Sequence, residues 1–228
     1  MYRVLENRYL KDDMYLLRVE GNFKGEMGQF YMLRAWDTYP LLSRPISICD
    51  IDENSITFLY KVFGEGTEII SKLKKEDTIK LEGPYGNGFS KVEGKVALVG
   101  GGIGIAPLYL VAKNIENCDA YIGFRNESIL EKEFNEVCNN VVVATNNEFV
   151  TEKLDVTKYD YILTCGPTPM MKHVVDMAKG TDTKVMVSLE NHMACGVGAC
   201  LVCTCKTNNG NKKTCKDGPV FWGDEVVF

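Results

Sequence analysis

The stretch "KVALVGGGIGIAPLYLVAKNI", residues 95–115, restricts the fold of this chain more than any other part of the sequence. An apolar run of strand length leads into four closely spaced glycines, and an apolar run of helical character follows. A buried strand, a glycine turn and a helix in this order are typical of parallel, doubly wound sheets. The uncharged part is shorter than the roughly 20 residues that span a bilayer. We therefore expect an α/β domain here and no membrane segment.

Four later segments continue this pattern up to about residue 187. Each is a short, almost continuously apolar run, and helical or loop segments separate them, as expected for parallel strands covered on both faces. We predict a doubly wound domain over residues 93–187. The four runs are "DAYIGFRN", "NVVVATN", "DYILTCGP" and "KVMVSLE".

The first 92 residues have a different character. Short segments of β-type composition alternate with turns that contain Gly, Asp, Asn and Pro, which indicates an antiparallel sandwich or barrel. One helix is expected at 66–75, because Ile69, Ile70 and Leu73 fall on one face and Thr67 stands near its start. The segments read as strands are 14–21, 29–36, 45–52 and 55–62.

The glycine turn is a candidate nucleotide site. Gly102, Gly104 and Pro107 form a G-x-G-x-x-P pattern, in which glycines let a pyrophosphate approach the backbone at a helix N-terminus. The alternative is a plain strand-to-helix turn that binds nothing. A later strand ends in "TCGPTPMM", at the sheet edge where ligands bind. Cys165 in that segment is either a small buried apolar residue or a neighbour of a nicotinamide ring.

Two features of the first 92 residues suit a phosphate. Arg44 and Ser47 flank Pro45 at the start of a strand, and an arginine there can hold a phosphate through paired donors. A surface arginine before an edge-strand proline is the simpler alternative. Gly66 and Thr67 then begin the expected helix, a second N-terminus that favours an anion.

The segment "MACGVGACLVCTCKTNNGNKKTC", residues 193–215, contains five of the nine cysteines. Cys195, Cys200, Cys203 and Cys215 follow the C-x4-C-x2-C…C spacing of plant-type [2Fe–2S] sites. Four thiolates also suit zinc, although structural zinc sites usually show two short cysteine pairs and only one is present here. The N-terminus has no apolar segment typical of a secretion signal, which disfavours a disulfide framework.

The remaining cysteines and the histidines are given no ligand role. Cys205 lies outside the spacing; on a strand it would face the same side as Cys203, but a spare buried thiol is the preferred interpretation. His173 is expected to be a surface or packing residue, and His192 is close to the cysteine segment without being a ligand. The scattered cysteines, expected to pack as small apolar residues apart from the possible role of Cys165, are Cys49, Cys118, Cys138 and Cys165.

Net charge and thiol content narrow the functional class. The formal charge of −5 lacks the basic footprint of a nucleic-acid-binding protein. Clustered cysteines without a secretion signal favour metal binding or redox chemistry in the cytoplasm. The sequence shows no pair of carboxylates that would indicate a general acid and base. We therefore expect bound cofactors to supply the chemistry.

Taken in order, "RPIS", "LYK", "GT", "GGGIGIAPL" and "CGPTPMM" resemble motifs of the ferredoxin–NADP reductase superfamily. The tail "SLENHMACGVGACLVCTC…TCKDGPVF" resembles one branch, the electron transfer subunits of class B dihydroorotate dehydrogenase. The resemblance covers nearly the whole chain. It implies a six-stranded antiparallel Greek-key barrel that binds FAD (residues 1–92), a Rossmann-like NAD-binding domain (93–187) and a C-terminal cysteine-rich [2Fe–2S] domain (188–228).

The resemblance also implies residue roles. Ser47 would lie near the reactive edge of the flavin and Cys165 near the nicotinamide. NAD is the expected nucleotide, although Arg125 follows the second strand of the sheet, where an arginine favours the 2′-phosphate of NADP. The residues implied are Arg44, Pro45, Ile46, Ser47, Leu59, Tyr60, Lys61, Gly66 and Thr67 for FAD, Gly102, Gly104, Cys165, Gly166 and Pro167 for NAD, and Cys195, Cys200, Cys203 and Cys215 for the cluster.

The function implied is an electron relay in pyrimidine (UMP) biosynthesis. Electrons from dihydroorotate would pass from the FMN of a separate catalytic subunit through [2Fe–2S] and FAD to NAD⁺, in a heterotetramer with two copies of each subunit. The tail "GPVFWGDEVVF" is expected to be exposed and to dock that partner. Two alternatives are the small subunit of a sulfide dehydrogenase or of an NADH-dependent ferredoxin:NADP oxidoreductase. A zinc-stabilised nucleotide-binding module is the non-enzymatic alternative.

Overall fold

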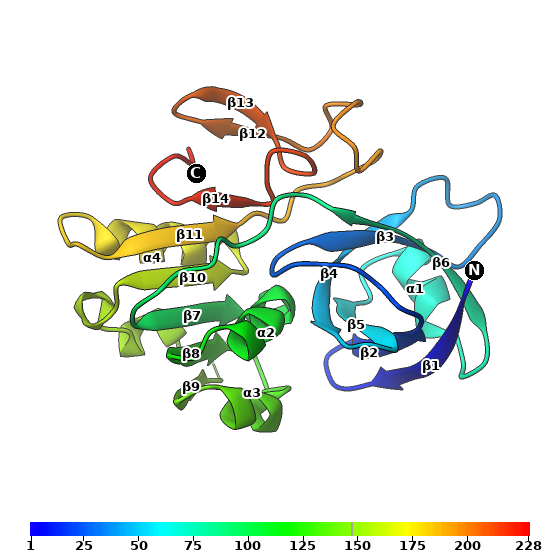
Figure 1. Ribbon diagram of the computed structural model, residues 1–228, viewed down its shortest axis with the longest axis horizontal. Coiled ribbons are helices and arrows are strands. Elements are labelled where there is room, and N and C mark those ends of the chain that lie inside the picture. Colours follow the sequence, from blue (N-terminus) through cyan, green and yellow to red (C-terminus); the bar gives the residue numbers. More distant parts are fainter. Residues whose placement is uncertain (147) are drawn as a thin grey trace.

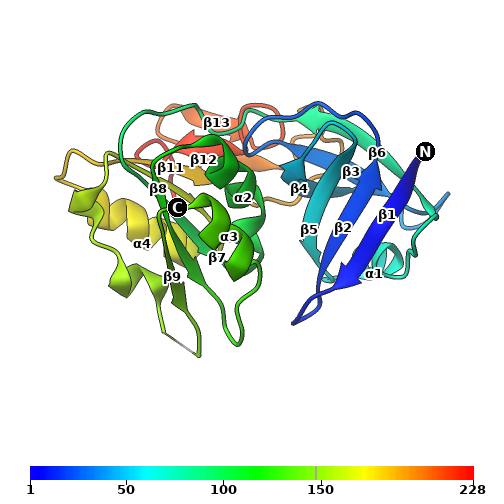
Figure 2. The same cartoon turned by 60° about the horizontal axis from the view of Figure 1, so that its bottom comes forward.

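The computed structural model describes residues 1–146 and 148–228. A β-barrel built from the N-terminal part of the chain stands beside a larger, mostly parallel sheet, and a small hairpin near the C-terminus lies next to the edge strand β14 (Val220–Trp222) of that sheet (Figures 1 and 2). Helix α2 (Ile105–Asn114) lies between the sheet and the barrel (Figure 1).

The barrel is closed and has six antiparallel strands in the order β1-β2-β5-β4-β3-β6. β3, β4 and β5 follow one another as hairpins, and β6 returns beside β3, which is the Greek-key arrangement. The segments read as strands from the sequence correspond to β2 to β5, and β1 and β6 complete the barrel. The strands are β1 (Tyr2–Tyr9), β2 (Met14–Glu20), β3 (Phe30–Arg34), β4 (Arg44–Ile51), β5 (Ser55–Lys61) and β6 (Thr78–Tyr85).

Alternating side chains fill the barrel. Leu17 and Val19 of β2 and Ile56, Phe58 and Tyr60 of β5 point into a single apolar core, as the period of two along a strand requires.

Helix α1 (Glu65–Ser71) packs its Ile70 into the barrel core. The side-chain amide of Asn7 donates to the backbone oxygens of Ile70 (2.8 Å) and Leu73 (3.0 Å), which ties the end of the helix to β1. The helix therefore stops at Ser71, earlier than the expected segment 66–75.

The second sheet has six strands in the order β14-β11-β10-β7-β8-β9, and all neighbours are parallel except β11 and β14. α2 and α3 cover one face and α4 the other, so two separate apolar cores flank the sheet. This is the doubly wound arrangement predicted from the apolar runs. The elements are β7 (Val96–Gly101), β8 (Cys118–Gly123), α3 (Glu131–Val137), β9 (Asn140–Ala144), β10 (Tyr161–Cys165), α4 (Thr168–Ala178), β11 (Lys184–Ser188) and β14 (Val220–Trp222).

The C-terminal segment leaves this sheet after β11 and later returns to it. In between it forms a cysteine-rich loop over residues 189–203, called the cysteine loop below, and the hairpin of β12 (Thr204–Thr207) and β13 (Gly210–Lys213). β14 then pairs with β11, and Pro219 bridges to Asn87 in the connection from the barrel. The expectation of an exposed tail is wrong for the first two residues of β14, because Val220 and Phe221 are both only 8% exposed, whereas Trp222 is exposed as expected. Edge pairing and apolar packing bury these two residues.

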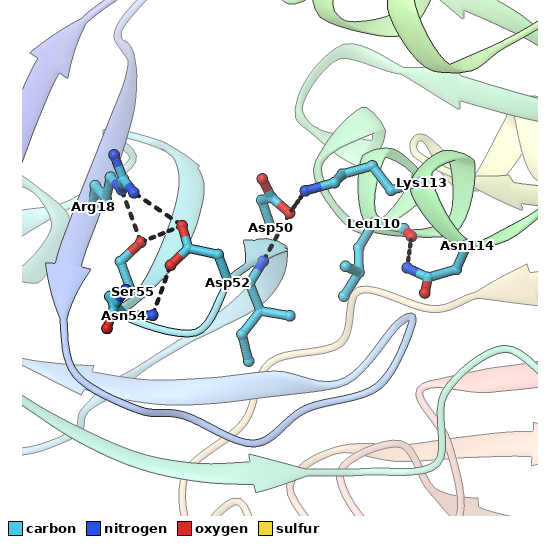
Figure 3. A network of polar contacts seen from close by, with 9 residues as sticks. Arg18, Asp50, Asp52, Asn54, Ser55, Leu110, Lys113 and Asn114 are labelled. Carbon is cyan, nitrogen blue, oxygen red and sulfur yellow. Dashed lines mark hydrogen bonds and ion pairs between the residues drawn. The ribbon is translucent and has the colours of Figure 1, made fainter.

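Helix α2 connects the sheet domain to the barrel through one apolar and one polar contact. Leu110 of α2 packs into the barrel core, and one turn later Lys113 Nζ lies 2.6 Å from Asp50 Oδ1 of β4 (Figure 3). A second contact joins the turn after β1 to the loop after β8, where Asn126 Nδ2 donates to both carboxylate oxygens of Asp12 at 3.1 Å. These contacts fix the two halves of the molecule against each other.

In the part of the chain that the structure describes, the helices are too short or too polar to cross a bilayer.

Candidate cofactor-binding sites

A cavity of about 650 Å³ opens where the barrel, the sheet and the cysteine-rich segment meet. The β7–α2 turn contributes Ile103, Ala106 and Pro107 to its wall, and the chain after β11 contributes the run 188–193. Its volume falls in the range of cofactor pockets. Eight of the nine residues expected to hold FAD line it, namely Arg44, Pro45, Ile46, Ser47, Leu59, Tyr60, Lys61 and Thr67.

Arg44 is held at the cavity by three neighbours. Its guanidinium lies 5.4 Å from the centre of the Trp36 ring and donates to the backbone oxygen of Leu42. On another side it lies against Gly66, where a Cβ atom would come within 2.5 Å of Arg44 Nε. Gly66, the ninth expected FAD residue, therefore does not line the cavity but leaves room for the arginine that does.

Tyr60 and Thr67 use their hydroxyl groups within the protein. Tyr60 Oη donates to Asn7 Oδ1 at 3.0 Å, and burial raises the pKa of this phenol. Thr67 Oγ1 accepts from the backbone N–H of Phe63 at 2.9 Å and donates to the backbone oxygen of Gly64 at 2.8 Å. Both hydroxyls shape the end of β5 and the start of α1.

The two segments expected to receive NAD lie against each other at the carboxyl edge of the sheet. A Cβ atom on Gly104 would lie 2.4 Å from the backbone oxygen of Cys165 and 2.6 Å from Gly166 Cα, so only glycine permits this approach. Gly102 has a φ of +55°, with no atom near its missing side chain. Pro107 stands in the first turn of α2 and Pro167 precedes α4, so two helix N-termini begin at this edge.

Glu190 is a site residue that the sequence did not indicate. It lies in the cavity wall, and Cys165 Sγ donates to its Oε1 at 3.6 Å. The cavity leaves the side chain partly open, but the protein around the carboxyl group raises its pKa. Burial also raises the pKa of the Cys165 thiol. Cys165 is therefore a buried residue, as the simpler interpretation predicts, and its position beside a nicotinamide ring stays a prediction.

The four cysteines with cluster spacing lie in two pairs. Cys203 and Cys215 share a small apolar core, and the Cys215 N–H donates to Cys203 Sγ at 3.4 Å. Cys195 and Cys200 interact with each other at the start of the loop. In the described part of the chain, no three His, Cys, Asp or Glu side chains converge into a ready-made metal site.

The loop between these pairs directs backbone N–H groups at sulfur. Gly198 N–H donates to Cys215 Sγ at 3.1 Å, and N–H groups of Val197 and Cys200 lower the pKa of Cys195 to about 6. Gly196 and Gly198 have φ values of +71° and +80°, which let the loop turn tightly. Backbone donors at Cys195, Cys203 and Cys215 suit an iron–sulfur cluster, whose charged sulfurs need N–H partners.

Cys205 belongs to a different environment. Its side chain packs in the core shared with Phe221, and its Sγ donates to the backbone oxygen of Lys212 at 3.6 Å. His192 lines the cavity, and His173 is exposed on α4. Arg125 is exposed directly after β8.

Comparison with solved structures identifies the class of protein. A chain of the NADH-dependent reduced ferredoxin-NADP oxidoreductase superposes with a TM-score of 0.89 at 29% identity, covering 100% of this chain and 90% of that chain. The flavohem-like FAD/NAD-binding domain of nitric oxide dioxygenase from Vibrio cholerae shares the fold, with a TM-score of 0.67 and 15% identity over 82% of this chain and 98% of that domain. The barrel, sheet and thiol-rich loop therefore define an iron–sulfur flavoprotein reductase of the ferredoxin reductase-like class.

Sequence relatives narrow this class to one family. The electron transfer subunits of dihydroorotate dehydrogenase B (NAD(+)) from Clostridium acetobutylicum and Clostridium perfringens are 48% and 47% identical, over 99% of this chain and 96% and 97% of their own lengths. Residues 190–227 match the iron-sulfur cluster binding domain of dihydroorotate dehydrogenase B. This chain belongs to the family of dihydroorotate dehydrogenase B electron transfer subunits.

These comparisons confirm the predicted family, the fold class and the oxidoreductase role. They also confirm the cofactors FAD, a [2Fe–2S] cluster and NAD as co-substrate.

Proposed function

We propose that this chain carries electrons to NAD⁺. The electrons would come from a separate catalytic subunit that oxidises dihydroorotate, as the names of the chain's relatives imply. One observation carries the proposal: a single cavity is lined by the barrel, by the β7–α2 turn and by the segment that leads into the cysteine loop. Electron transfer requires short separations, and a cavity bordered by these three segments supports short separations between the cofactors that they would bind. The sulfide dehydrogenase and ferredoxin:NADP alternatives share the architecture but differ in partner.

The residues of the chain divide into three binding roles. Those lining the cavity from β4 and β5, with Arg44 foremost, would hold FAD, and Gly66 would keep that arginine in place. Gly102, Gly104 and the turn Cys165–Pro167 would receive NAD, with Ser47 toward the flavin and Cys165 toward the nicotinamide. Two thiol pairs match the need of two irons for two thiolates each, so Cys195, Cys200, Cys203 and Cys215 would be the ligands. When bound, FAD and the cluster supply the conversion between two-electron and one-electron transfer.

We also propose that the partner docks on the cysteine loop. Val197, Leu201 and Val202 are 53%, 62% and 55% exposed, and Cys200 beside them is exposed too. Apolar side chains grouped on an exposed loop are typical of interaction sites. The partner would be an FMN-containing catalytic subunit, in a heterotetramer with two copies of each chain. A cytoplasmic location is supported by nine free thiols, since reducing compartments maintain them.

The decisive experiment is reconstitution of the anaerobically purified chain. Visible and EPR spectra before and after NADH should show a flavin and a [2Fe–2S] centre that both respond. The chain alone should reduce artificial acceptors with NADH and produce orotate from dihydroorotate only with the catalytic subunit. Orotate formation by the lone chain would refute the relay, and a colourless, zinc-containing protein would favour the nucleotide-binding module.

One specific observation supports the ferredoxin:NADP alternative, namely the TM-score of 0.89 to the NADH-dependent reduced ferredoxin-NADP oxidoreductase chain. Sequence identity favours the dihydroorotate family, at 48% against 29%. A pull-down from cell extract separates them, because the two hypotheses require different partner subunits. Comparing NADH with NADPH in the acceptor assay tests whether the exposed Arg125 admits a 2′-phosphate.

A further inference from the structure

Cys118 and Cys138 form a thiol pair that the electron relay does not use. Their Sγ atoms lie 3.7 Å apart, although the residues are 20 positions apart in the sequence. Cys118 begins β8, and Cys138 caps the C-terminus of α3. Both therefore lie at the amino end of the sheet, about 16 Å along β8 from the carboxyl edge where the nucleotide turns are found. Neither residue lines the cofactor cavity.

Backbone hydrogen bonds hold the two residues in this position. Asn139 N–H donates to the backbone oxygen of Cys118 at 2.9 Å, and Cys138 N–H donates to that of Phe134 at 2.9 Å. The side-chain amide of Asn139 donates to Asn117 Oδ1, also at 2.9 Å. These bonds on both sides of the pair hold the two sulfurs next to each other.

We propose that Cys118 and Cys138 are a reversible disulfide site that responds to the thiol–disulfide balance around the protein. The two thiols differ in access, because Cys118 is buried and Cys138 is partly exposed. This difference orders the reaction: a small disulfide such as oxidised glutathione meets Cys138 first, and Cys118 follows. Within residues 1–146 and 148–228, no other cysteine before the cysteine loop has a hydrogen bond to a second thiol: Cys49 packs in an apolar core and Cys165 contacts Glu190.

The chemistry is two successive thiol–disulfide exchanges. Cys138 attacks the small disulfide, which forms a mixed disulfide and releases one thiol that takes up the proton. Cys118 then attacks Cys138 Sγ, closes the protein disulfide and releases the second thiol with the second proton. The two cysteine sulfurs lose two electrons and the small disulfide gains them.

Closing this bond would constrain the segment between β8 and α3. That segment contains Arg125 and the loop whose Asn126 contacts Asp12 of the barrel. A cross-link over 20 positions reduces the freedom of the unfolded chain, so we expect the Tm to rise by roughly 5–10 °C. The pair would thus stabilise the nucleotide half of the molecule under oxidising conditions.

Trypsin provides a clear test, because it cuts the two cysteines into separate peptides. Cleavage after Lys113, Arg125, Lys132 and Lys153 gives peptides 114–125 and 133–153, each with one cysteine. The anaerobic, cofactor-loaded chain is equilibrated in glutathione buffers from fully reduced to fully oxidised, alkylated and digested. We expect these two peptides to become linked in most molecules, and dithiothreitol to separate them.

Single variants distinguish a built pair from general oxidation. Cys118→Ser should leave Cys138 as a mixed disulfide with glutathione, whereas Cys138→Ser should leave Cys118 free because it is buried. Both should abolish the Tm difference between oxidised and reduced protein, and Cys49→Ser should retain the link. If Cys118→Ser does not fold, Cys138→Ser, at the partly exposed position, still tests the site. Absence of linked peptides in oxidised wild type, or Cys138 that stays glutathionylated beside a free Cys118, would overturn the proposal.

Discussion

Cys165 Sγ donates a hydrogen bond to Glu190 Oε1 across 3.6 Å, which joins the end of β10 to the first residues of the cysteine-rich segment. Glu190 lies in the wall of the cofactor cavity, and Cys165 lies behind it in the turn expected to receive NAD. A thiol and a carboxyl group with raised pKa values thus meet where the three parts of the chain converge. Both groups are kept in their protonated, neutral forms to higher pH than in water, which limits charge next to the cavity.

Glu190→Gln should change how stability depends on pH. The pKa of Glu190 is higher in the folded protein than its ordinary value of 4.5, so the folded state binds this proton more tightly. Wild type therefore loses stability as the pH rises from about 4.5 through the raised pKa, and the variant lacks this loss. We expect the Tm of the variant relative to wild type to increase between pH 5 and pH 8.5. Glu93→Gln, at an exposed position, is the control; an equal pH dependence in both variants would contradict the assignment.

Replacing each cysteine of the cysteine-rich segment by serine should separate ligands from neighbours. Cys195→Ser, Cys200→Ser, Cys203→Ser and Cys215→Ser should each lose most of the iron, because a [2Fe–2S] cluster needs all four thiolates. Cys205→Ser should retain it, since that sulfur contacts the Lys212 carbonyl in a different core. Iron analysis and EPR of anaerobic protein measure the outcome. Iron loss in Cys205→Ser with retention in one of the four would disprove the ligand set.

Gly66→Ala should weaken FAD binding. The added Cβ would come within 2.5 Å of Arg44 Nε, so the guanidinium must move from its position at the cavity. We expect a Kd for FAD that is at least about tenfold higher, which corresponds to about 1.4 kcal/mol. Fluorescence titration of the FAD-free chain provides the measurement.

Gly64→Ala is the matched control for that variant. Gly64 has an extended backbone and no atom within 4 Å of an added Cβ, so its Kd should stay within about twofold of wild type. Equal loss of affinity in both variants would show that the turn, and not Arg44, is responsible.

The ion pair between Lys113 and Asp50 should contribute measurably to the contact between the barrel and the sheet (Figure 3). These side chains are 34% and 26% exposed, so solvent screens them less than a surface pair. A double-mutant cycle with Lys113→Met and Asp50→Asn should give a coupling energy of about 1 kcal/mol in urea unfolding.

The exposed pair Lys72 and Glu68 on α1, separated by 2.8 Å, is the reference for this cycle. Its coupling should be only about 0.3–0.5 kcal/mol, the usual value for such a helix pair. If the two double-mutant cycles give the same coupling energy, Lys113 and Asp50 do not contribute more than an ordinary surface pair.

The sequence predicted the barrel, the doubly wound sheet and the part of the cavity wall formed by β4, β5 and Thr67, because these features leave local signals. Apolar periodicity marked the strands, and glycines marked the turns at Gly66 and Gly104. β1 was harder, since Tyr2–Tyr9 contains two arginines and a glutamate that its position at the surface of the barrel tolerates; Arg3, for example, pairs with Glu20 of β2 at 2.6 Å. The composition of a segment does not show which other strand will pair with it.

Contacts between distant segments escaped the sequence for the same reason. Nothing near Glu190 marks a thiol 25 positions earlier as its neighbour, and nothing near Cys118 marks Cys138. Spacing alone also placed Cys205 on the side of Cys203, whereas packing places these two sulfurs in different cores. The tail was read as exposed because its pairing with β11 depends on a turn around the cysteine loop.

The return of β14 to β11 has a consequence for the order of synthesis. The barrel can close once β6 has left the ribosome, but the sheet gains its last strand only after Trp222 has emerged. Until then one edge of β11 is unpaired. The cysteine loop is attached to the sheet only through β11, because β14 has not yet paired there. Before that moment the cysteines lie on a loop that is attached to the sheet at one end only, so they are not yet held in position for iron. We therefore expect the cluster to assemble after the whole segment has been translated.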